Sequence, residues 1–175
     1  EHLGETVGKR FVLMWAWHPK ALPTAVPASA AIAAAHLGME VTIVRPAGYD
    51  LDPDDYVAIE ALAGKRGGSL QITDELDGAI EGAHVVYPKS WGSLAHFGNP
   101  EAERAGREGK RDWRLTQARM RATAAGKGIA MHCLPVRRNV EMDGDVLDGP
   151  NSAVIDQAEN RLHAQRALLL EIIGR

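Results

Sequence analysis

The 175-residue sequence contains a single cysteine, Cys133. One cysteine cannot form an internal disulfide, and it excludes a zinc site built from several cysteines. No apolar run approaches the roughly 18 residues that a membrane-spanning helix needs, and the sequence shows no signal peptide. These absences predict a chain that works in a reducing compartment, the cytoplasm, without contact with a membrane.

An excess of charge of one sign is also missing. The 20 lysines and arginines nearly balance the 23 aspartates and glutamates, giving a net charge of -3 without a basic tail or an acidic block. A nucleic acid is therefore not expected as a partner. What remains is ordinary: 45% hydrophobic and 25% charged residues are typical of a soluble globular protein, and the length suits one domain with a sizeable core.

Strand and helix patterns alternate along the chain. Short apolar runs predict six strands, at 11–15, 40–44, 69–72, 83–87, 129–131 and 153–155. Helices are predicted between and after them, at 24–37, 53–65, 75–80, 115–125 and 156–173. This alternation predicts an α/β fold, a three-layer, Rossmann-like, doubly wound parallel sheet in one domain.

Local signals add detail to this outline. Asp74 is expected to cap the third helix, and the spacing of Asp156 and Glu159 is that of a capping box that opens the last one. Leu162, Leu169 and Ile173 would then lie along one face of that helix. Residues 145–147 are expected to form a turn. Residues 88–112 are expected to form one long irregular segment, and loops of that length are usually functional or mobile.

The most informative stretch is 131–139, which follows the fifth predicted strand. It carries an imidazole, the thiol and two guanidiniums, from His132, Cys133, Arg137 and Arg138. Ligands of open α/β sheets bind beyond the carboxyl ends of the strands, so this stretch predicts a site for a planar, anionic or polarised group. The alternatives are a hydrogen-bonded core histidine, a small buried thiol and a solvated pair of arginines.

Two kinds of site are not expected. No Gly-x-Gly-x-x-Gly follows the first predicted strand, so a dinucleotide cofactor is disfavoured. His132 and Cys133 have no further ligands at a spacing suited to zinc. The sequence therefore predicts a site without a cofactor or a metal.

The stretch 132–140, His-Cys-Leu-Pro-Val-Arg-Arg-Asn-Val, resembles the signature of the aspartate/ornithine carbamoyltransferases, and its Arg-Arg-Asn part is most similar to the N-acetylornithine and N-succinylornithine branch. Three further blocks match in the right order, at 11–26, 85–92 and 159–163. The resemblance covers the whole chain and only the carboxyl-terminal half of a transcarbamylase. It implies that residues 1–175 are an ornithine-binding-type domain. The Ser-x-Arg-Thr phosphate loop of the amino-terminal carbamoyl phosphate domain is absent, so this polypeptide alone is not expected to catalyse.

The resemblance implies transfer of a carbamoyl group from carbamoyl phosphate to the side-chain amine of an N-acyl-ornithine, a step of arginine biosynthesis. It implies catalytic roles for three residues: His132, Cys133 and Arg161. It implies substrate-binding roles for five: Lys89, Trp91, Leu134, Arg137 and Glu141. The chemistry agrees, because a neutral amine needs an acceptor such as a backbone carbonyl near Leu134, and the carbonyl oxygen that gains charge needs donors such as His132 and Arg161.

Lys89 carries the most discriminating expectation. Plain ornithine transcarbamylases have an aspartate at the equivalent place, which suits a free α-ammonium. A lysine would repel that cation and attract the α-carboxylate, so it favours a substrate with an acylated α-nitrogen. Glu141 lies where some acetylornithine relatives carry a modified lysine, and it would supply a similar negative group. The alternatives are a surface lysine on a loop and, for Arg161, a pair with Glu159 or a solvent-facing charge.

The resemblance also implies a trefoil knot, with residues 17–27 and 87–99 as the crossing segments, and a homotrimer with shared sites. Two other functions stay open. One is a knotted transcarbamylase-like protein that acts on another amine or ureido compound. The other is a non-catalytic Rossmann-like binding module.

Overall fold

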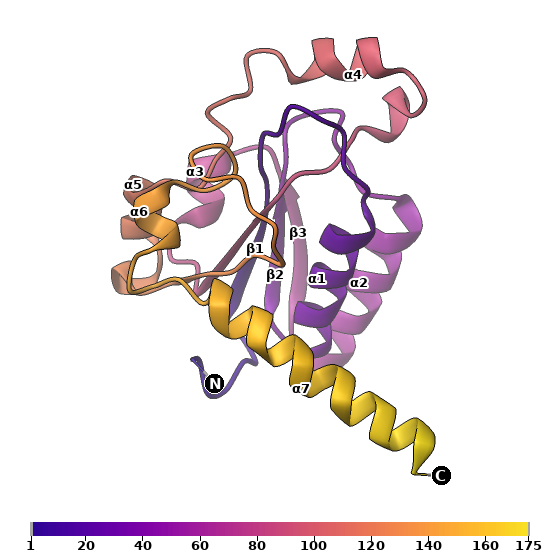
Figure 1. Cartoon of the computed structure of the whole chain (residues 1–175), viewed down its shortest axis with the longest axis vertical. Helices are drawn as coiled ribbons and strands as arrows, with labels where there is room; N and C mark the ends of the chain where they lie inside the picture. The colour runs from indigo at the N-terminus through magenta and orange to yellow at the C-terminus, as the bar shows by residue number, and fades with distance from the viewer. Residues whose placement is uncertain (1, 175) are drawn as a thin grey trace.

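A computed structural model describes residues 2–174 (Figure 1). Five parallel strands form one sheet in the order β3-β2-β1-β4-β5. Their bounds are β1 Arg10–Trp15, β2 Glu40–Val44, β3 Ser69–Thr73, β4 Val85–Lys89 and β5 Ile129–Ala130. The predicted α/β fold with a parallel sheet is confirmed. The strand order reverses between β1 and β4, and such a reversal opens a crevice at the carboxyl ends of the two strands.

Helices cover both faces of the sheet, with α1 and α2 on one side and α3, α5 and α6 on the other (Figure 1). The bounds are α1 Ala25–His36, α2 Pro53–Arg66, α3 Leu76–Ile80, α4 Pro100–Arg107, α5 Gln117–Ala122, α6 Gly144–Leu147 and α7 Val154–Ile173, with 3-10 turns η1 Leu94–His96 and η2 Ala124–Gly126.

Strand β1 shows why the sheet needs a continuous apolar run. Phe11, Leu13 and Trp15 belong to the core cluster under α1 and α2, whereas Val12 and Met14 belong to the cluster on the opposite face. A strand in the middle of a parallel sheet is buried on both faces, so every side chain must be apolar.

Helix α2 begins and ends where its sequence predicts. The Asp52 side chain accepts a hydrogen bond from the Asp54 backbone N–H, and Pro53 occupies the first turn, where its missing N–H costs nothing. Gly67 ends the helix with φ +82°, a left-handed conformation that glycine adopts without strain.

The predicted sixth strand at 153–155 is wrong. Ser152 makes an isolated bridge to Ala130, the Ala153 N–H bonds the Ala130 carbonyl, and α7 then begins at Val154. The capping box of Asp156 and Glu159 is wrong as well, because Ala153 is the cap residue and no side chain caps the helix. The Ala153 carbonyl accepts from the Gln157 N–H, so the helical bonds take the place of further strand pairing.

Three smaller predictions also need correction. Segment 88–112 contains η1 and α4, and α4 starts with a standard signal: the Asn99 side chain caps it and Pro100 opens it. The cap residue of α3 is Glu75 rather than Asp74, and residues 145–147 belong to a short helix, α6.

Helix α7 projects from the domain (Figure 1). Its predicted apolar face exists but does not lie on the core. Seven of its large apolar side chains are exposed: Ile155, Leu162, Leu168, Leu169, Leu170, Ile172 and Ile173. Within residues 2–174, none of the helices combines the length and the apolar character needed to cross a bilayer.

Candidate functional site

Three segments meet at the carboxyl edge of the sheet, each following a strand. They are residues 16–24 after β1, residues 90–93 after β4 and residues 131–141 after β5. Backbone hydrogen bonds hold them there: the Ala16 N–H donates to the Lys89 carbonyl at 2.9 Å, and the Met131 N–H donates to the Val86 carbonyl at 3.1 Å. The predicted site residues on β4 and on 131–141 are therefore neighbours in space.

His132 is fully buried, and its tautomer follows from its contacts. The Leu134 backbone N–H donates to His132 Nδ1 at 3.0 Å, so Nδ1 is an acceptor. In the neutral ring the proton must then sit on Nε2. Nε2 lies 3.6 Å from Glu141 Oε1, and the ring stacks on Tyr87 with 6.3 Å between centroids. His132 can therefore donate a hydrogen bond from Nε2.

Glu141 is a buried carboxylate, with 2% of its surface exposed. Its Oε2 accepts from the Arg137 backbone N–H at 3.0 Å. Burial alone would raise the pKa of Glu141, but the His132 ring, the Arg137 N–H and the Lys89 charge outweigh it and hold that pKa below its ordinary value. The side chain is therefore ionised at neutral pH.

Lys89 ends β4 and is buried at 8% exposure, paired in register with Trp15. Its Nζ lies 4.0 Å from Glu141 Oε1, which is too far for a hydrogen bond. The alternative of a surface lysine on a loop does not fit this position. His132 Nε2 and Glu141 Oε1 have no hydrogen-bond partner in the described part of the chain. The Lys89, Glu141 and His132 side chains thus form a loosely spaced buried group. Its two unpartnered atoms, His132 Nε2 and Glu141 Oε1, are available to bind a ligand.

The outer side of this group is formed by residues 133–137. Cys133 is half-buried beside Tyr87, and burial raises the pKa of the Tyr87 hydroxyl, which therefore stays protonated. Leu134 is 36% exposed and has φ +54°, a conformation that costs a leucine on the order of 1–3 kcal/mol and is found most often at functional sites. The Arg137 side chain is exposed, and within residues 2–174 its guanidinium makes no hydrogen bond or ion pair.

Two predicted site residues do not join this group. Trp91 is fully buried, its indole N–H donates to the Tyr49 carbonyl at 2.8 Å, and its own carbonyl accepts from Trp15. It supports the loop from the core and presents no free surface. Arg161 is the eighth residue of α7 and is exposed, and no contact between described residues joins it to His132 or Cys133.

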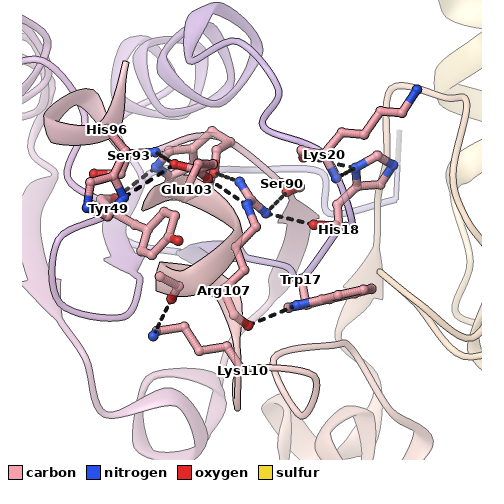
Figure 2. Close-up of polar contacts among 12 residues, drawn as sticks. Trp17, His18, Lys20, Tyr49, Ser90, Ser93, His96, Glu103, Arg107 and Lys110 are labelled. Carbon is pink, nitrogen blue, oxygen red and sulfur yellow. Dashed lines mark hydrogen bonds and ion pairs between the residues drawn. The ribbon is translucent and has the colours of Figure 1, made fainter. Parts of the chain in front are cut away.

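A second buried polar group, which was not predicted from the sequence, lies next to this site (Figure 2). The Arg107 Nε donates to Glu103 Oε1 at 2.6 Å, and both side chains are almost fully buried. His18 is buried as well, and burial lowers the pKa of its imidazole. The available signals were the i, i+4 spacing of Glu103 and Arg107 and the Asn-Pro start of α4.

A cavity of about 820 Å³ lies between the 19–25 loop and residues 92–107. Its lining includes Ser93 and Arg107 but not Lys89, His132 or Glu141. Cavity volume therefore does not identify the site. Unpartnered buried polar atoms occur at His132 and Glu141 but also elsewhere, at Tyr49, Ser93, His96, Arg114 and Gln157. The distinguishing feature is that Glu141 Oε1 belongs to a buried carboxylate. Within residues 2–174, histidine, cysteine and carboxylate side chains do not gather into a metal-binding group.

Comparison with known proteins gives consistent matches. The family described as "Aspartate/ornithine carbamoyltransferase, Asp/Orn binding domain" matches residues 17–172. An N-acetylornithine carbamoyltransferase of Xanthomonas campestris pv. campestris is 42% identical over 178 residues, which cover 100% of this chain and 52% of that protein. An ornithine carbamoyltransferase of Symbiobacterium thermophilum is 38% identical over 140 residues, 80% of this chain and 44% of that protein.

Solved structures agree with these relatives. A crystal structure of N-acetyl-L-ornithine transcarbamylase superimposes with a TM-score of 0.91 at 42% identity, covering 94% of this chain and 50% of that one. A structure of acetylornithine transcarbamylase complexed with acetylcitrulline gives a TM-score of 0.89 at 42% identity, covering 94% and 49%. The chain spans about half the length of the curated relatives it matches most fully.

Proposed function

This chain belongs to the aspartate/ornithine carbamoyltransferase family, and from that premise we propose that it is the amino-acid-binding domain of an N-acetylornithine carbamoyltransferase. The whole enzyme would transfer a carbamoyl group from carbamoyl phosphate to the side-chain amine of N-acetylornithine, a step of arginine biosynthesis. The observation that carries this proposal is the buried group of Lys89, Glu141 and His132, with its two unpartnered polar atoms.

The charges of the site support an acylated amino acid as the substrate. Lys89 and Arg137 supply two positive charges and Glu141 supplies one negative charge, so these three side chains carry a net charge of +1. An N-acyl-ornithine whose side-chain amine is neutral carries one carboxylate and no α-ammonium. Lys89 and Arg137 attract that carboxylate, whereas a free α-ammonium beside Lys89 would be repelled.

The same atoms can assist the reaction. The neutral side-chain amine attacks the carbamoyl carbon, the bond to the phosphate oxygen breaks, and the phosphate leaves with the electron pair of that bond. The proton lost by the amine passes to the departing phosphate. Negative charge grows on the carbamoyl oxygen, and the His132 Nε2–H is a buried donor suited to stabilise it. Cys133 and the exposed Leu134 carbonyl region would lie at the transferred group and the amine, and Arg161 would bind carbamoyl phosphate.

The wider organisation is part of the proposal. Residues 1–175 would form one domain, and a carbamoyl phosphate domain would lie elsewhere in the protein. The exposed apolar face of α7 supports this, because such a face is stable when another domain covers it. We place the enzyme in the cytoplasm as a homotrimer. A trefoil knot is also part of the proposal; its crossing segments lie side by side, since the Gly92 N–H donates to the Leu22 carbonyl at 2.8 Å.

Calorimetric titration with N-acetylcitrulline, N-succinylcitrulline and citrulline tests the proposal, with the domain joined to its carbamoyl phosphate half. N-acetylcitrulline should bind and citrulline should not. Lys89→Asp should weaken binding at least about tenfold, because a buried carboxylate would then face the ligand carboxylate. Lys127→Asp is the matched control, since Lys127 is exposed outside the site.

Two results would contradict the proposal. Citrulline that binds as tightly as N-acetylcitrulline would remove the role of the acyl group, and unchanged affinity in Lys89→Asp would remove the role of Lys89. If none of the three compounds bound, turnover of a panel of other amines would separate the carbamoyltransferase alternative from a non-catalytic binding module.

A further inference from the structure

The group built on Arg107 joins three segments that are far apart in the sequence (Figure 2). Arg107 Nη1 donates to the His18 carbonyl at 3.0 Å and to Ser90 Oγ at 3.2 Å, and Nη2 donates to the Trp91 carbonyl at 2.7 Å. One guanidinium on α4 thus binds the loop after β1 and the segment after β4. Only a planar fork with several donors can reach these acceptors together.

Glu103 holds this guanidinium in place. It lies one helical turn before Arg107 and accepts from Arg107 Nε, while its Oε2 accepts from the Ser93 backbone N–H at 3.1 Å. The Arg107 guanidinium also lies over the rings of Trp15 and Tyr49, 5.2 Å and 5.4 Å from their centroids. Contacts on several sides leave Arg107 little freedom to move.

Helix α4 can approach this closely because of Gly106. A Cβ atom at Gly106 would lie 3.0 Å from His96 Cε1 and 3.0 Å from Tyr49 Oη, which is tighter than nine in ten real Cβ contacts. The missing side chain lets the helix sit against η1 and the core. The position of Arg107 is therefore determined by the backbone as well as by Glu103.

One of the segments that Arg107 holds, at the end of β4, adjoins the proposed ligand site, and the loop after β1 is hydrogen-bonded to that strand end. Lys89 directly precedes Ser90, and the Lys89 carbonyl accepts from Ala16, two residues before His18. We propose that Arg107, oriented by Glu103, is a positioning residue for this site. It fixes where β1 and β4 end, and thereby the distance of Lys89 from Glu141 and His132, without touching the ligand. This inference rests on the proposed function for its ligand.

A purely structural role makes a different prediction. If Arg107 only stabilised the fold, its replacement would lower the melting temperature but leave the affinity of the folded protein unchanged. A positioning role changes the affinity of the folded protein itself, because the attraction between Lys89 and the ligand carboxylate depends on the distance at which Lys89 is held. Affinity measured well below the melting temperature separates the two roles.

The test compares Arg107→Lys and Glu103→Gln with Arg104→Gln, an exposed arginine on the same helix. N-acetylcitrulline is titrated into the enzyme with its carbamoyl phosphate half, and amide hydrogen exchange is followed at residues 16–24 and 89–93. Arg107→Lys keeps the charge but loses the fork, so affinity should fall at least about tenfold and exchange should rise in both segments. Glu103→Gln should show a smaller change of the same kind, and Arg104→Gln neither.

Unchanged affinity in folded Arg107→Lys and Glu103→Gln would overturn the inference. If Arg107→Lys does not fold, Glu103→Gln, which keeps the shape of the side chain, decides. If the unsubstituted enzyme does not bind N-acetylcitrulline, the proposed function fails. In that case the hydrogen-exchange result by itself tests whether Arg107 positions the ends of β1 and β4. Faster exchange in Arg107→Lys that is confined to residues 16–24 and 89–93 supports this role, and unchanged exchange overturns it.

Discussion

Two buried charged groups lie near the same edge of the sheet and differ in how well their atoms are paired. Around Arg107 the polar contacts are 2.6–3.2 Å long and involve Glu103, His18, Ser90 and Trp91. Around Glu141 the distances to His132 and Lys89 are 3.6 Å and 4.0 Å, and two atoms have no partner within residues 2–174. The charged side chains of both groups are buried, so burial does not distinguish a structural group from a binding group, whereas the pairing of the charged atoms themselves does.

The difference has a physical reason. A buried charge is tolerated when it is paired and hydrogen-bonded, and it is costly otherwise. The Arg107 and Glu103 charges meet that condition within the domain, although Tyr49 Oη, Ser93 Oγ and His96 Nδ1 beside them have no hydrogen-bond partner within residues 2–174. The Glu141 group does not meet it, because Glu141 Oε1 and His132 Nε2 have no hydrogen-bond partner within residues 2–174. These two atoms lower the stability of the folded domain, and a ligand that bonds them would raise it. Binding sites commonly lower stability in this way.

The largest expected effect is therefore on stability, in Arg107→Leu. This substitution leaves the Glu103 carboxylate buried without its partner and should lower the free energy of unfolding by about 3–5 kcal/mol. Lys89→Met removes a poorly paired buried cation and should change the free energy of unfolding by no more than about 1 kcal/mol. Urea denaturation of the two variants beside the unsubstituted domain measures both values.

A double variant sharpens this result. Glu103→Leu combined with Arg107→Leu removes both charges, so it should recover part of the stability that Arg107→Leu loses. Equal losses for Lys89→Met and Arg107→Leu would show that the two groups do not differ in the way their contacts suggest.

A smaller effect is expected in the pH dependence of stability. The pKa of Glu141 is lower in the folded chain than its ordinary value of 4.5, in spite of burial, because His132, the Arg137 N–H and Lys89 favour the carboxylate. Its contribution to stability is complete above pH 4.5 and is lost as the pH falls through the lower folded pKa. In Glu141→Gln, the free energy of unfolding, measured by urea denaturation, should depend less steeply on pH in that acid range.

His18 supplies an internal control for this measurement. Burial lowers the pKa of His18 from 6.5, so the unfolded chain binds its proton first and stability falls as the pH drops below 6.5. That slope should persist in Glu141→Gln and become smaller in His18→Asn, where His84, whose pKa burial also lowers, still contributes. An acid slope near pH 4 that survives in Glu141→Gln would have to come from other carboxylates.

The smallest effect is expected at Arg138. Its guanidinium bonds Asp148 on the surface, with 3.0 Å between Nη2 and Oδ1, and exposed pairs of this kind contribute little. Arg138→Gln should leave the affinity for N-acetylcitrulline within about twofold, whereas the adjacent Arg137→Gln should weaken it about tenfold or more. Titration of the two variants side by side tests which arginine faces the ligand, and equal losses would argue against Arg137 alone.

The sequence predicts most of the sheet because a buried parallel strand needs an unbroken apolar run, as residues 11–15 show. It does not predict the helix start at Val154, because three apolar residues can begin a helix as well as form a strand. For α4 it offers only the Asn99-Pro100 start signal and no apolar periodicity, because the two side chains that this helix buries, Glu103 and Arg107, are charged.

The candidate site shows a similar division. His132, Cys133 and Arg137 are close in sequence, and their crowding at a strand end is visible without a structure. Lys89 and Glu141 are separated by 52 positions, and only the resemblance to a family suggested that they belong together. Their 4.0 Å separation depends on β4 and β5 lying side by side. The unpartnered state of Glu141 Oε1 is a property of the folded chain alone.

The exposed face of α7 has a consequence for handling the protein. Seven large apolar side chains on one projecting helix form a surface through which copies of the chain can adhere to each other in water. The sedimentation coefficient of the isolated domain should therefore rise with concentration, and replacing Leu169 and Ile173 by glutamate should suppress that rise. Titrations of the isolated domain are best performed at dilutions where it sediments as a single species.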